Sequence, residues 1–198
     1  MKSLKTIIAI FSLAVFAVSC NSNDDDSPEP ITYPEENPLN AYLTGSGFEQ
    51  KTEEVKDAFF SEFGFSFKPT VNGKINALAV KMPDVNTTLK VTIWDVATKT
   101  AIRTEIVSIP TANVTVEKLI TPIALIKGKE YYITRNSNDW YKRYRTDGSA
   151  TTYPIVAGNI TITGYAYIAN NTGAPLFPTN LLNTDYAGDT SFKFQQTE

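Results

Sequence analysis

The densest group of residues able to do chemistry is the segment 131–145, with the sequence YYITRNSNDWYKRYR. It brings the rings of Trp140, Tyr141 and Tyr144 together with Asp139 and several bases. Aromatic faces stack on the C–H faces of sugars, and a few polar groups then fix the ring hydroxyls. We therefore expect a binding site here, made by Trp140, Tyr141, Tyr144, Asp139, Arg143 and Arg145.

Segment 131–145 has two further interpretations. As a long loop, it would cover the end of a hydrophobic core with its rings while its bases stay in solvent. Alternatively, the bases would attract an acidic polymer or a lipid headgroup; these bases are Arg135, Lys142, Arg143 and Arg145. For a binding role we expect a long loop on a rigid scaffold, because binding residues gather on such loops.

The composition excludes several kinds of catalytic and metal site. The chain has 198 residues, no His and one Cys. It therefore has no Ser-His-Asp or Cys-His catalysis, no internal disulfide and no Cys-based or His-based metal site. The net charge of −3 also argues against a nucleic-acid partner, which calls for a strong basic excess.

Carboxylates offer the remaining route to hydrolysis. Glycosidases use two carboxyl groups about 5–9.5 Å apart. The candidates are Asp84, Asp95, Glu105, Asp139 and Asp147. Neither motif nor spacing sets a pair apart, and Asp95 and Asp147 have the setting of turn residues. We expect no enzyme and no cofactor, and a structural Ca²⁺ stays open although no D-x-D-x-D-G run is present.

Residues 1–19 have the pattern of a secretory signal. Lys2 and Lys5 precede the apolar run 7–18, and small residues come just before Cys20. The run is too short for a bilayer span, which needs roughly 20 residues. The phrase AVSC resembles the bacterial lipobox, in which the Cys becomes the acylated N-terminus. That resemblance implies that Cys20 carries a lipid anchor.

Residues 20–38 read as an acidic tether. They hold six acids and no base, with prolines at near-regular spacing. Such a segment cannot bury apolar surface, so we expect it to be extended and disordered. The phrase NSNDDDSPEP resembles the acidic export signal of surface-exposed lipoproteins in Bacteroidetes. The resemblance implies an outer-membrane location facing the cell exterior.

The remaining chain reads as a lead-in segment, 39–61, and a β-sandwich, 62–198. The apolar spacing is compatible both with a short helix and with a lead-in strand in the segment KTEEVKDAFFSEF, which begins at Lys51. From Glu62 onward the period is two residues, and Asn72-Gly73 is a strong hairpin signal. A change of parity at Gly164 indicates a bulge.

About eight short strands follow from this pattern, with no helical period between them. The pattern predicts an all-β fold, a single antiparallel β-sandwich that is jelly-roll-like. Tyr131, Tyr132, Tyr165 and Tyr167 fall on predicted strands, where we expect them to pack in the core or across strands. Trp94 ends a strand and is likewise expected in the core.

Four phrases resemble a domain of unknown function found in secreted and surface bacterial proteins. They are FGFSFKPTVNGKINALAVKM, LKVTIWDVATKTAI, PIALIKGKEYYIT and FPTNLLNTDYAGDTSFKFQ, and together they span roughly residues 62–196. The resemblance implies a β-sandwich beside carbohydrate-active or adhesive modules and carries no catalytic residues. Residues 135–158 depart from it, being more basic and richer in Tyr.

The sequence thus predicts a lipid-anchored, non-catalytic binding module at the cell surface, with a glycan as its ligand. The alternative is a structural or adhesion component of a surface assembly that binds protein partners. Both hypotheses attach the chain to a membrane through Cys20.

Overall fold

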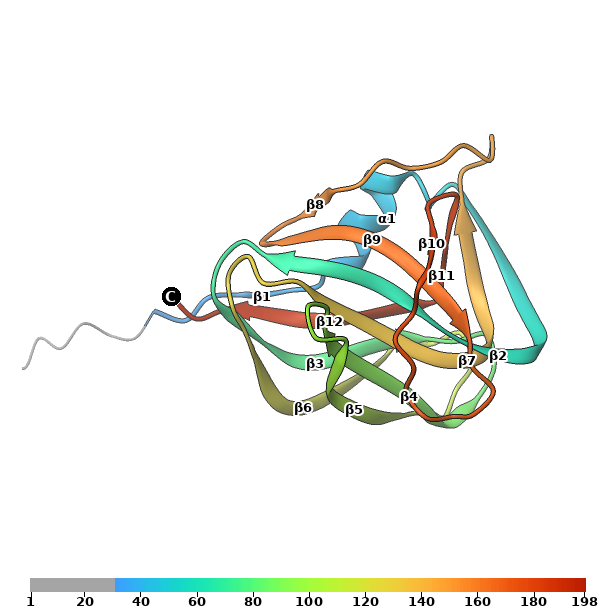
Figure 1. The fold of residues 1–198 in the computed structure, drawn as a ribbon, viewed down its shortest axis with the longest axis horizontal. Helices are drawn as coiled ribbons and strands as arrows, with labels where there is room; N and C mark the ends of the chain where they lie inside the picture. Colours follow the sequence, from blue (N-terminus) through green and yellow to red (C-terminus); the bar gives the residue numbers. More distant parts are fainter. Residues whose placement is uncertain (1–30) are drawn as a thin grey trace, which may run out of the picture. The chain divides into compact units, whose positions relative to one another are not determined.

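Two antiparallel sheets form the computed structural model, which describes residues 31–198 (Figure 1). One sheet has the order β1 (Glu35–Glu36), β12 (Asp189–Gln196), β3 (Gly73–Lys81) and β6 (Val116–Leu125). The other has the order β10 (Asn180–Leu182), β9 (Ile160–Ala169), β2 (Lys51–Pro69), β7 (Tyr131–Tyr144), β4 (Asn86–Asp95) and β5 (Thr100–Ile109). Off this path, β11 (Asp185–Ala187) pairs with β7 and β8 (Ile155–Ala157) pairs with β9. The predicted all-β sandwich is confirmed.

The strands pair as nested partners along the chain. β4 pairs with β5, β3 with β6, β2 with β7, and β1 with β12, all antiparallel. This nesting over two sheets is the arrangement of a jelly roll, so eight strands make the expected scaffold. The chain between β7 and β12, residues 145–188, is an insertion that contains β8, β9, β10 and β11.

Alternating aromatic residues of β2 fill the space between the sheets. Phe63, Phe65 and Phe67 are all buried, as the two-residue period predicts. The ring of Phe67 lies 4.6 Å from that of Phe192, which reaches in from the opposite sheet. Gly64 faces the other way, where an added Cβ would lie 1.8 Å from the carbonyl oxygen of Ile133. Only glycine allows this close approach between β2 and β7.

The last part of the expected tether belongs to the fold. Glu35 and Glu36 form β1 and pair with Gln195 and Phe194 of β12. The Glu36 carboxylate accepts hydrogen bonds from the backbone N–H and the side-chain amide of Asn159. Disorder through residue 38 was therefore a wrong expectation, because these acids have specific partners. The predicted signal peptide, Cys20 and the tether up to residue 30 lie outside the described residues.

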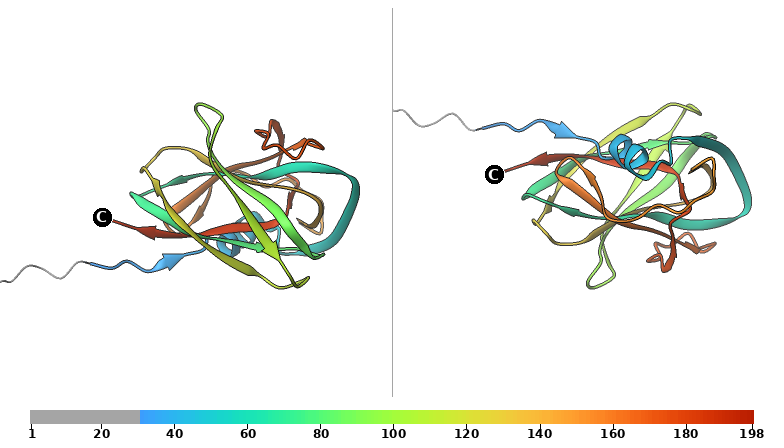
Figure 2. Two further views of the ribbon diagram at one scale, coloured as in Figure 1. Left: turned by 90° about the horizontal axis from the view of Figure 1, so that it is seen from below. Right: turned by 90° about the horizontal axis from the view of Figure 1, so that it is seen from above.

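The lead-in segment contains both a helix and a strand. α1 spans Leu39–Ser46 and lies against β8 and β12 (Figure 2). It ends where Gly47 adopts a φ of 74°, a conformation that favours glycine. From Lys51 the chain is already β2, so the near-helical spacing of apolar residues there was misleading. A register shift between Lys56 and Ser61 breaks the ladder with β7 at this point.

The residues Asn72-Gly73 do not form a hairpin, contrary to the prediction. β2 and β3 lie in different sheets, so the chain crosses between the layers at this turn. Asn72 instead accepts the backbone N–H of Lys127 on its side chain and that of Thr197 on its carbonyl. At Gly73 an added Cβ would lie 2.3 Å from the Phe194 ring, so close packing explains the glycine.

Two local predictions are confirmed. The chain turns between β4 and β5, where the Asp95 carboxylate accepts the backbone N–H groups of Ala97 and Thr98. The register between β2 and β9 shifts beside Gly164, which is the expected bulge. Among residues 31–198, no helix is long and apolar enough to cross a membrane.

Candidate functional site

The segment richest in candidate residues is a strand, so the expected long loop was wrong. β7 pairs with β2 on one edge and with β4 and then β11 on the other. Thr134, Arg135 and Ser137 are polar yet buried within it. Buried strands usually read as apolar runs, so these polar residues concealed the strand in the sequence.

The bases of this segment have partners inside the fold. Arg135 is fully buried, with its guanidinium carbon 5.0 Å from the centre of the Phe63 ring. Arg143 forms a two-pronged ion pair with Asp189. Arg145 donates to the carbonyl of Ser46 at 2.7 Å. These engagements weaken the interpretation of a basic stripe that attracts an acidic polymer or a headgroup.

Three of the expected site residues serve other purposes. Tyr141 is buried, and its hydroxyl donates to the side chain of Asn113. Asp139 is 5% exposed, and burial raises the pKa of its carboxyl group. The hydroxyl of Tyr144 donates to the Glu53 carboxylate at the edge of the sheet. Of the six residues predicted to act together, only Trp140 lines the cavity described next.

Trp140 lies on one wall of a cavity of about 390 Å³. Its ring meets Phe63 edge-on at 5.4 Å, which leaves part of the indole facing the cavity. The insertion builds the opposite wall with Tyr165 and Tyr167 of β9. The cavity is lined by Glu53, Val55, Asp57, Ser61, Phe63, Trp140, Lys142, Tyr165, Tyr167, Leu182, Asp185 and Ala187.

The backbone around the cavity is held by sheet pairing on several sides. β2 carries Glu53 and Val55 opposite Lys142 and Trp140 of β7. β10 adds to the edge of β9, and β11 adds to the edge of β7, so the insertion closes around the site. Sites on paired strands are held more firmly than sites on free loops. The aromatic walls are therefore preorganised for a ligand.

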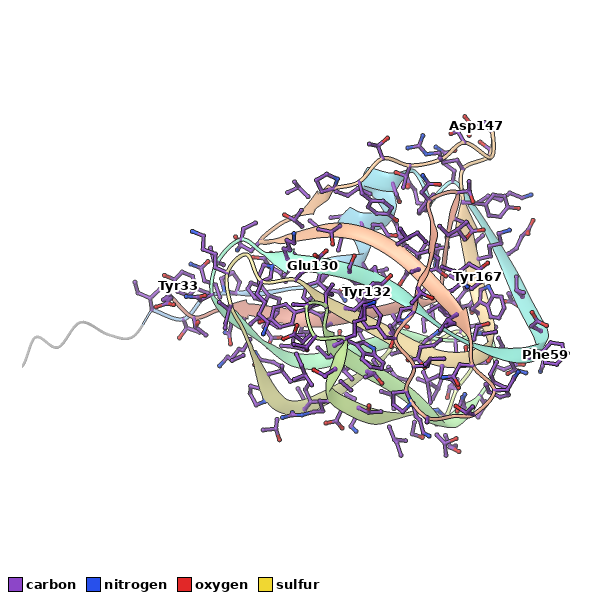
Figure 3. The ribbon with its side chains drawn as sticks, viewed as in Figure 1. Tyr33, Phe59, Glu130, Tyr132, Asp147 and Tyr167 are labelled. Atoms are coloured by element: carbon purple, nitrogen blue, oxygen red, sulfur yellow. The ribbon has the colours of Figure 1, made fainter. Side chains whose placement is uncertain are left out.

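The aromatic walls differ in their exposure. Tyr165 is buried, and its ring meets that of Tyr186 edge-on at 5.6 Å, so it supports the cavity from below. Tyr167 is 40% exposed and offers its ring to a ligand. In Figure 3, Tyr167 and Phe59 lie toward one end of the folded part and Tyr33 lies at the other.

Acidic groups dominate the rim of the cavity. The Lys142 ammonium lies 3.2 Å from Asp185, and Lys51 lies 3.0 Å from Glu53. The Tyr144 hydroxyl and then Lys51 lower the pKa of the Glu53 carboxyl group. Glu53 is therefore ionised at neutral pH. The cavity lining holds three carboxylates and only one ammonium group.

This arrangement can hold a ring-shaped polar ligand. Apolar ring faces contact Trp140 and Tyr167, while the carboxylates accept hydrogen bonds from hydroxyl or amino groups. Within residues 31–198, nothing accepts a hydrogen bond from the indole Nε1 of Trp140, which leaves that donor for a ligand. The cavity volume falls within the range of about 300–1,000 Å³ common for ligand sites.

Sequence reasoning missed most of the cavity. The expected core packing is confirmed for Tyr165 and wrong for Tyr167, which is 40% exposed. No pattern in the sequence points to Glu53, Asp57 or Asp185. The parity of Tyr165 and Tyr167 after the Gly164 bulge was the one available signal, since it places both rings on one face. The pairing of β11 with β7, which brings Asp185 to the site, leaves no mark in the sequence.

The carboxylates considered for hydrolysis have other roles in the fold. Asp95 and Asp147 are turn residues as expected, and each accepts backbone N–H groups two residues ahead. Glu105 pairs with Lys118 at 2.7 Å, and Asp84 pairs with Lys56 at 2.5 Å. Over the described range 31–198, no three Asp, Glu or Cys side chains cluster as a metal site.

The fold and the cavity together define a class: a jelly-roll sandwich with an aromatic pocket rimmed by acids. In comparisons with known proteins, no family model and no curated protein matches the chain.

Proposed function

We propose that this chain is a non-catalytic, lipid-anchored module that binds glycan in the Trp140 cavity. One observation carries the proposal. Trp140, which is partly exposed, and Tyr167, which is 40% exposed, line the same cavity of about 390 Å³ together with three carboxylates. Aromatic walls with a few convergent polar groups are typical of ligand sites.

Sugar chemistry suits this cavity. A pyranose ring presents C–H groups on its faces and hydroxyl groups around its edge. The faces contact aromatic rings, and the edge meets carboxylates and the indole N–H. Asp185 and Glu53 are already held in place by Lys142 and by Lys51 with Tyr144, so binding need not order them. Such preorganisation raises affinity.

The proposed lipid anchor at Cys20 is supported by the resemblance of AVSC to the lipobox. The folded part begins near Tyr33, at the end opposite Phe59, and Tyr167 lies toward the Phe59 end (Figure 3). The cavity therefore lies toward the end of the folded part that is opposite Tyr33. The resemblance to a surface β-sandwich domain supports the surface anchor, with the module facing the cell exterior.

A glycan array probed with the purified chain tests this proposal, followed by titration calorimetry of any sugar that binds. We expect Trp140→Ala to lower affinity about tenfold, because the stacking interaction of one aromatic side chain contributes up to about 1.5 kcal/mol. Phe59→Ala is the matched control, as it removes an exposed ring outside the cavity. Unchanged binding by Trp140→Ala would show that the glycan binds outside the cavity. An array on which no glycan binds would contradict the proposed ligand class.

A second candidate is adhesion to a protein partner in a surface assembly. Phe59 and Phe60 are adjacent and 64% and 40% exposed, at a break in the β2 ladder. Exposed aromatic residues of this kind are typical of protein interfaces. A pull-down with defined stoichiometry, lost in Phe59→Ser but kept in Trp140→Ala, would favour this function over glycan binding.

A further inference from the structure

We propose that the Trp140 cavity selects a sugar that carries a free amino group, a protonated hexosamine, over neutral and N-acetylated sugars. This inference rests on the proposed glycan function and names the ligand class for the same site. The aromatic walls define the site, and the charges along its rim define the preference.

The charge balance of the lining is the first argument. Glu53, Asp57 and Asp185 contribute three negative charges to the lining, Lys142 contributes one positive charge, and Lys51 adds a second positive charge 3.0 Å from Glu53. Lys142 lies 3.2 Å from Asp185, so its positive charge offsets the negative charge of that carboxylate. A ligand that enters the cavity therefore meets a net negative rim. An acidic sugar would be repelled, and an ammonium group would be attracted.

Asp57 is the carboxylate best placed to receive the ammonium group. Its Oδ1 accepts the backbone N–H of Ala58 at 2.6 Å, and no Lys or Arg of the described residues pairs with it. The side chain of Asn138 donates to the Asp57 carbonyl at 3.1 Å and so holds the backbone at this point. Asp57 thus lines the cavity with a carboxylate that has no ion-pair partner among the described residues.

The aromatic walls reinforce the same preference. An ammonium group over the face of Trp or Tyr is attracted by the ring quadrupole, and the attraction grows where water is excluded. Trp140 and Tyr167 supply such faces beside Asp57. N-acetylation removes the charge from the sugar and adds bulk at the same carbon. The cavity therefore distinguishes an amine from its acetamide by charge.

Titration calorimetry on the full chain with three tetrasaccharides tests this inference. The probes are β-1,4-linked glucosamine, its fully N-acetylated form and the corresponding glucose oligomer. We expect the amine form to bind about tenfold more tightly than the other two, as one well-placed ion pair allows. Asp57→Asn should remove this preference and leave the weaker affinities unchanged.

Two controls separate the cavity from general attraction to an acidic surface. Asp147→Asn removes an exposed aspartate that is absent from the cavity lining, and it should leave the preference intact. Trp140→Ala should weaken the binding of all three probes by a similar factor, about tenfold, and unchanged binding in this variant would show that the sugars bind outside the cavity. An amine preference that persists in Asp57→Asn would overturn the assignment of the ammonium site.

The two proposals fail in different ways. Equal affinity for the amine, acetamide and glucose forms, weakened in Trp140→Ala, would overturn the amine preference and leave the glycan site standing. Absence of binding by all three probes, together with an empty glycan array, would overturn both. A thermal melt of each variant ensures that a lost signal reflects the site, since Asp57 and Trp140 are at least partly exposed.

Discussion

The two tryptophans of this protein sit in opposite kinds of environment. Trp94 is 4% exposed, its Nε1 donates to Thr134 at 2.8 Å, and Phe177 meets its ring edge-on at 5.6 Å. Trp140 is partly exposed, lies 5.4 Å from the Phe63 ring in a T-shaped arrangement and lines the cavity. One ring is enclosed by the protein, and the other is left open.

The difference lies in what the insertion does to each ring. Residues 170–177 close over Trp94, held by a buried chain of hydrogen bonds. In that chain Thr134 donates to Glu62, and the Asn170 side chain donates to the other Glu62 oxygen and to the Ala174 carbonyl. Around Trp140 the same insertion builds walls without a cover. An aromatic residue therefore serves stability where its polar atom is satisfied internally, and is available for binding where it is not.

Alanine substitutions should show the largest contrast between the two rings. Trp94→Ala should lower the free energy of unfolding by about 3–5 kcal/mol, because it empties a buried site. Trp140→Ala should cost about 1–2 kcal/mol, because less apolar surface is withdrawn from water. Urea denaturation followed by circular dichroism measures both values. Equal losses would show that Trp140 is as much a structural residue as Trp94.

Phenylalanine substitutions sharpen the comparison by removing only the indole N–H and part of the ring. Trp94→Phe should cost about 1–3 kcal/mol, since the Thr134 hydroxyl loses its donor in a buried setting. Trp140→Phe should change stability by less than about 1 kcal/mol, since no internal hydrogen bond is lost. The same denaturation experiment applies. A larger loss for Trp140→Phe would reveal a structural use of its N–H group.

The pH dependence of stability tests the hydrogen-bonded chain beneath Trp94. Burial raises the pKa of the Glu62 carboxyl group above its ordinary value of 4.5. The folded state then binds more protons than the unfolded state between 4.5 and the raised pKa. The stability that this group contributes is complete below pH 4.5 and is lost as the pH rises through the folded pKa.

Glu62→Gln isolates this effect. Relative to that variant, the parent chain should lose stability as the pH rises from 4.5 toward 7. Denaturation curves across that range give the difference. Parallel stability profiles for the two proteins would show that Glu62 titrates in the folded state as it does in the unfolded chain.

Periodicity predicted the parts of the fold where one face of a strand is apolar. The alternation of apolar residues predicted β2 at Phe63, Phe65 and Phe67. The change of parity at Gly164 predicted the bulge between β2 and β9. The prediction failed where burial and polarity coincide, as at Arg135 in β7. Local patterns carry no signal for a buried charge whose partners come from distant strands.

The candidate site was predictable only at Trp140. Its neighbours in sequence, Tyr141 and Asp139, are buried and do not line the cavity, because successive side chains of β7 point to opposite faces of the sheet. Its neighbours in space come from the bend of β2 and from the insertion. Glu35 and Glu36 show the same limit, since two acids after a proline gave no sign of a strand that only β12 completes.

The pairing of β1 with β12 also bears on how the protein can be engineered. It brings Glu35 opposite Gln195, and the Gln195 side chain donates to the Tyr33 carbonyl at 2.7 Å, so both ends of the folded part emerge together (Figure 1). A fluorescent protein or affinity tag joined after Glu198 would therefore lie at the Tyr33 end of the folded part, away from the Trp140 cavity. Joining the two ends by a short linker would equally permit new termini in the exposed turn at Gly148.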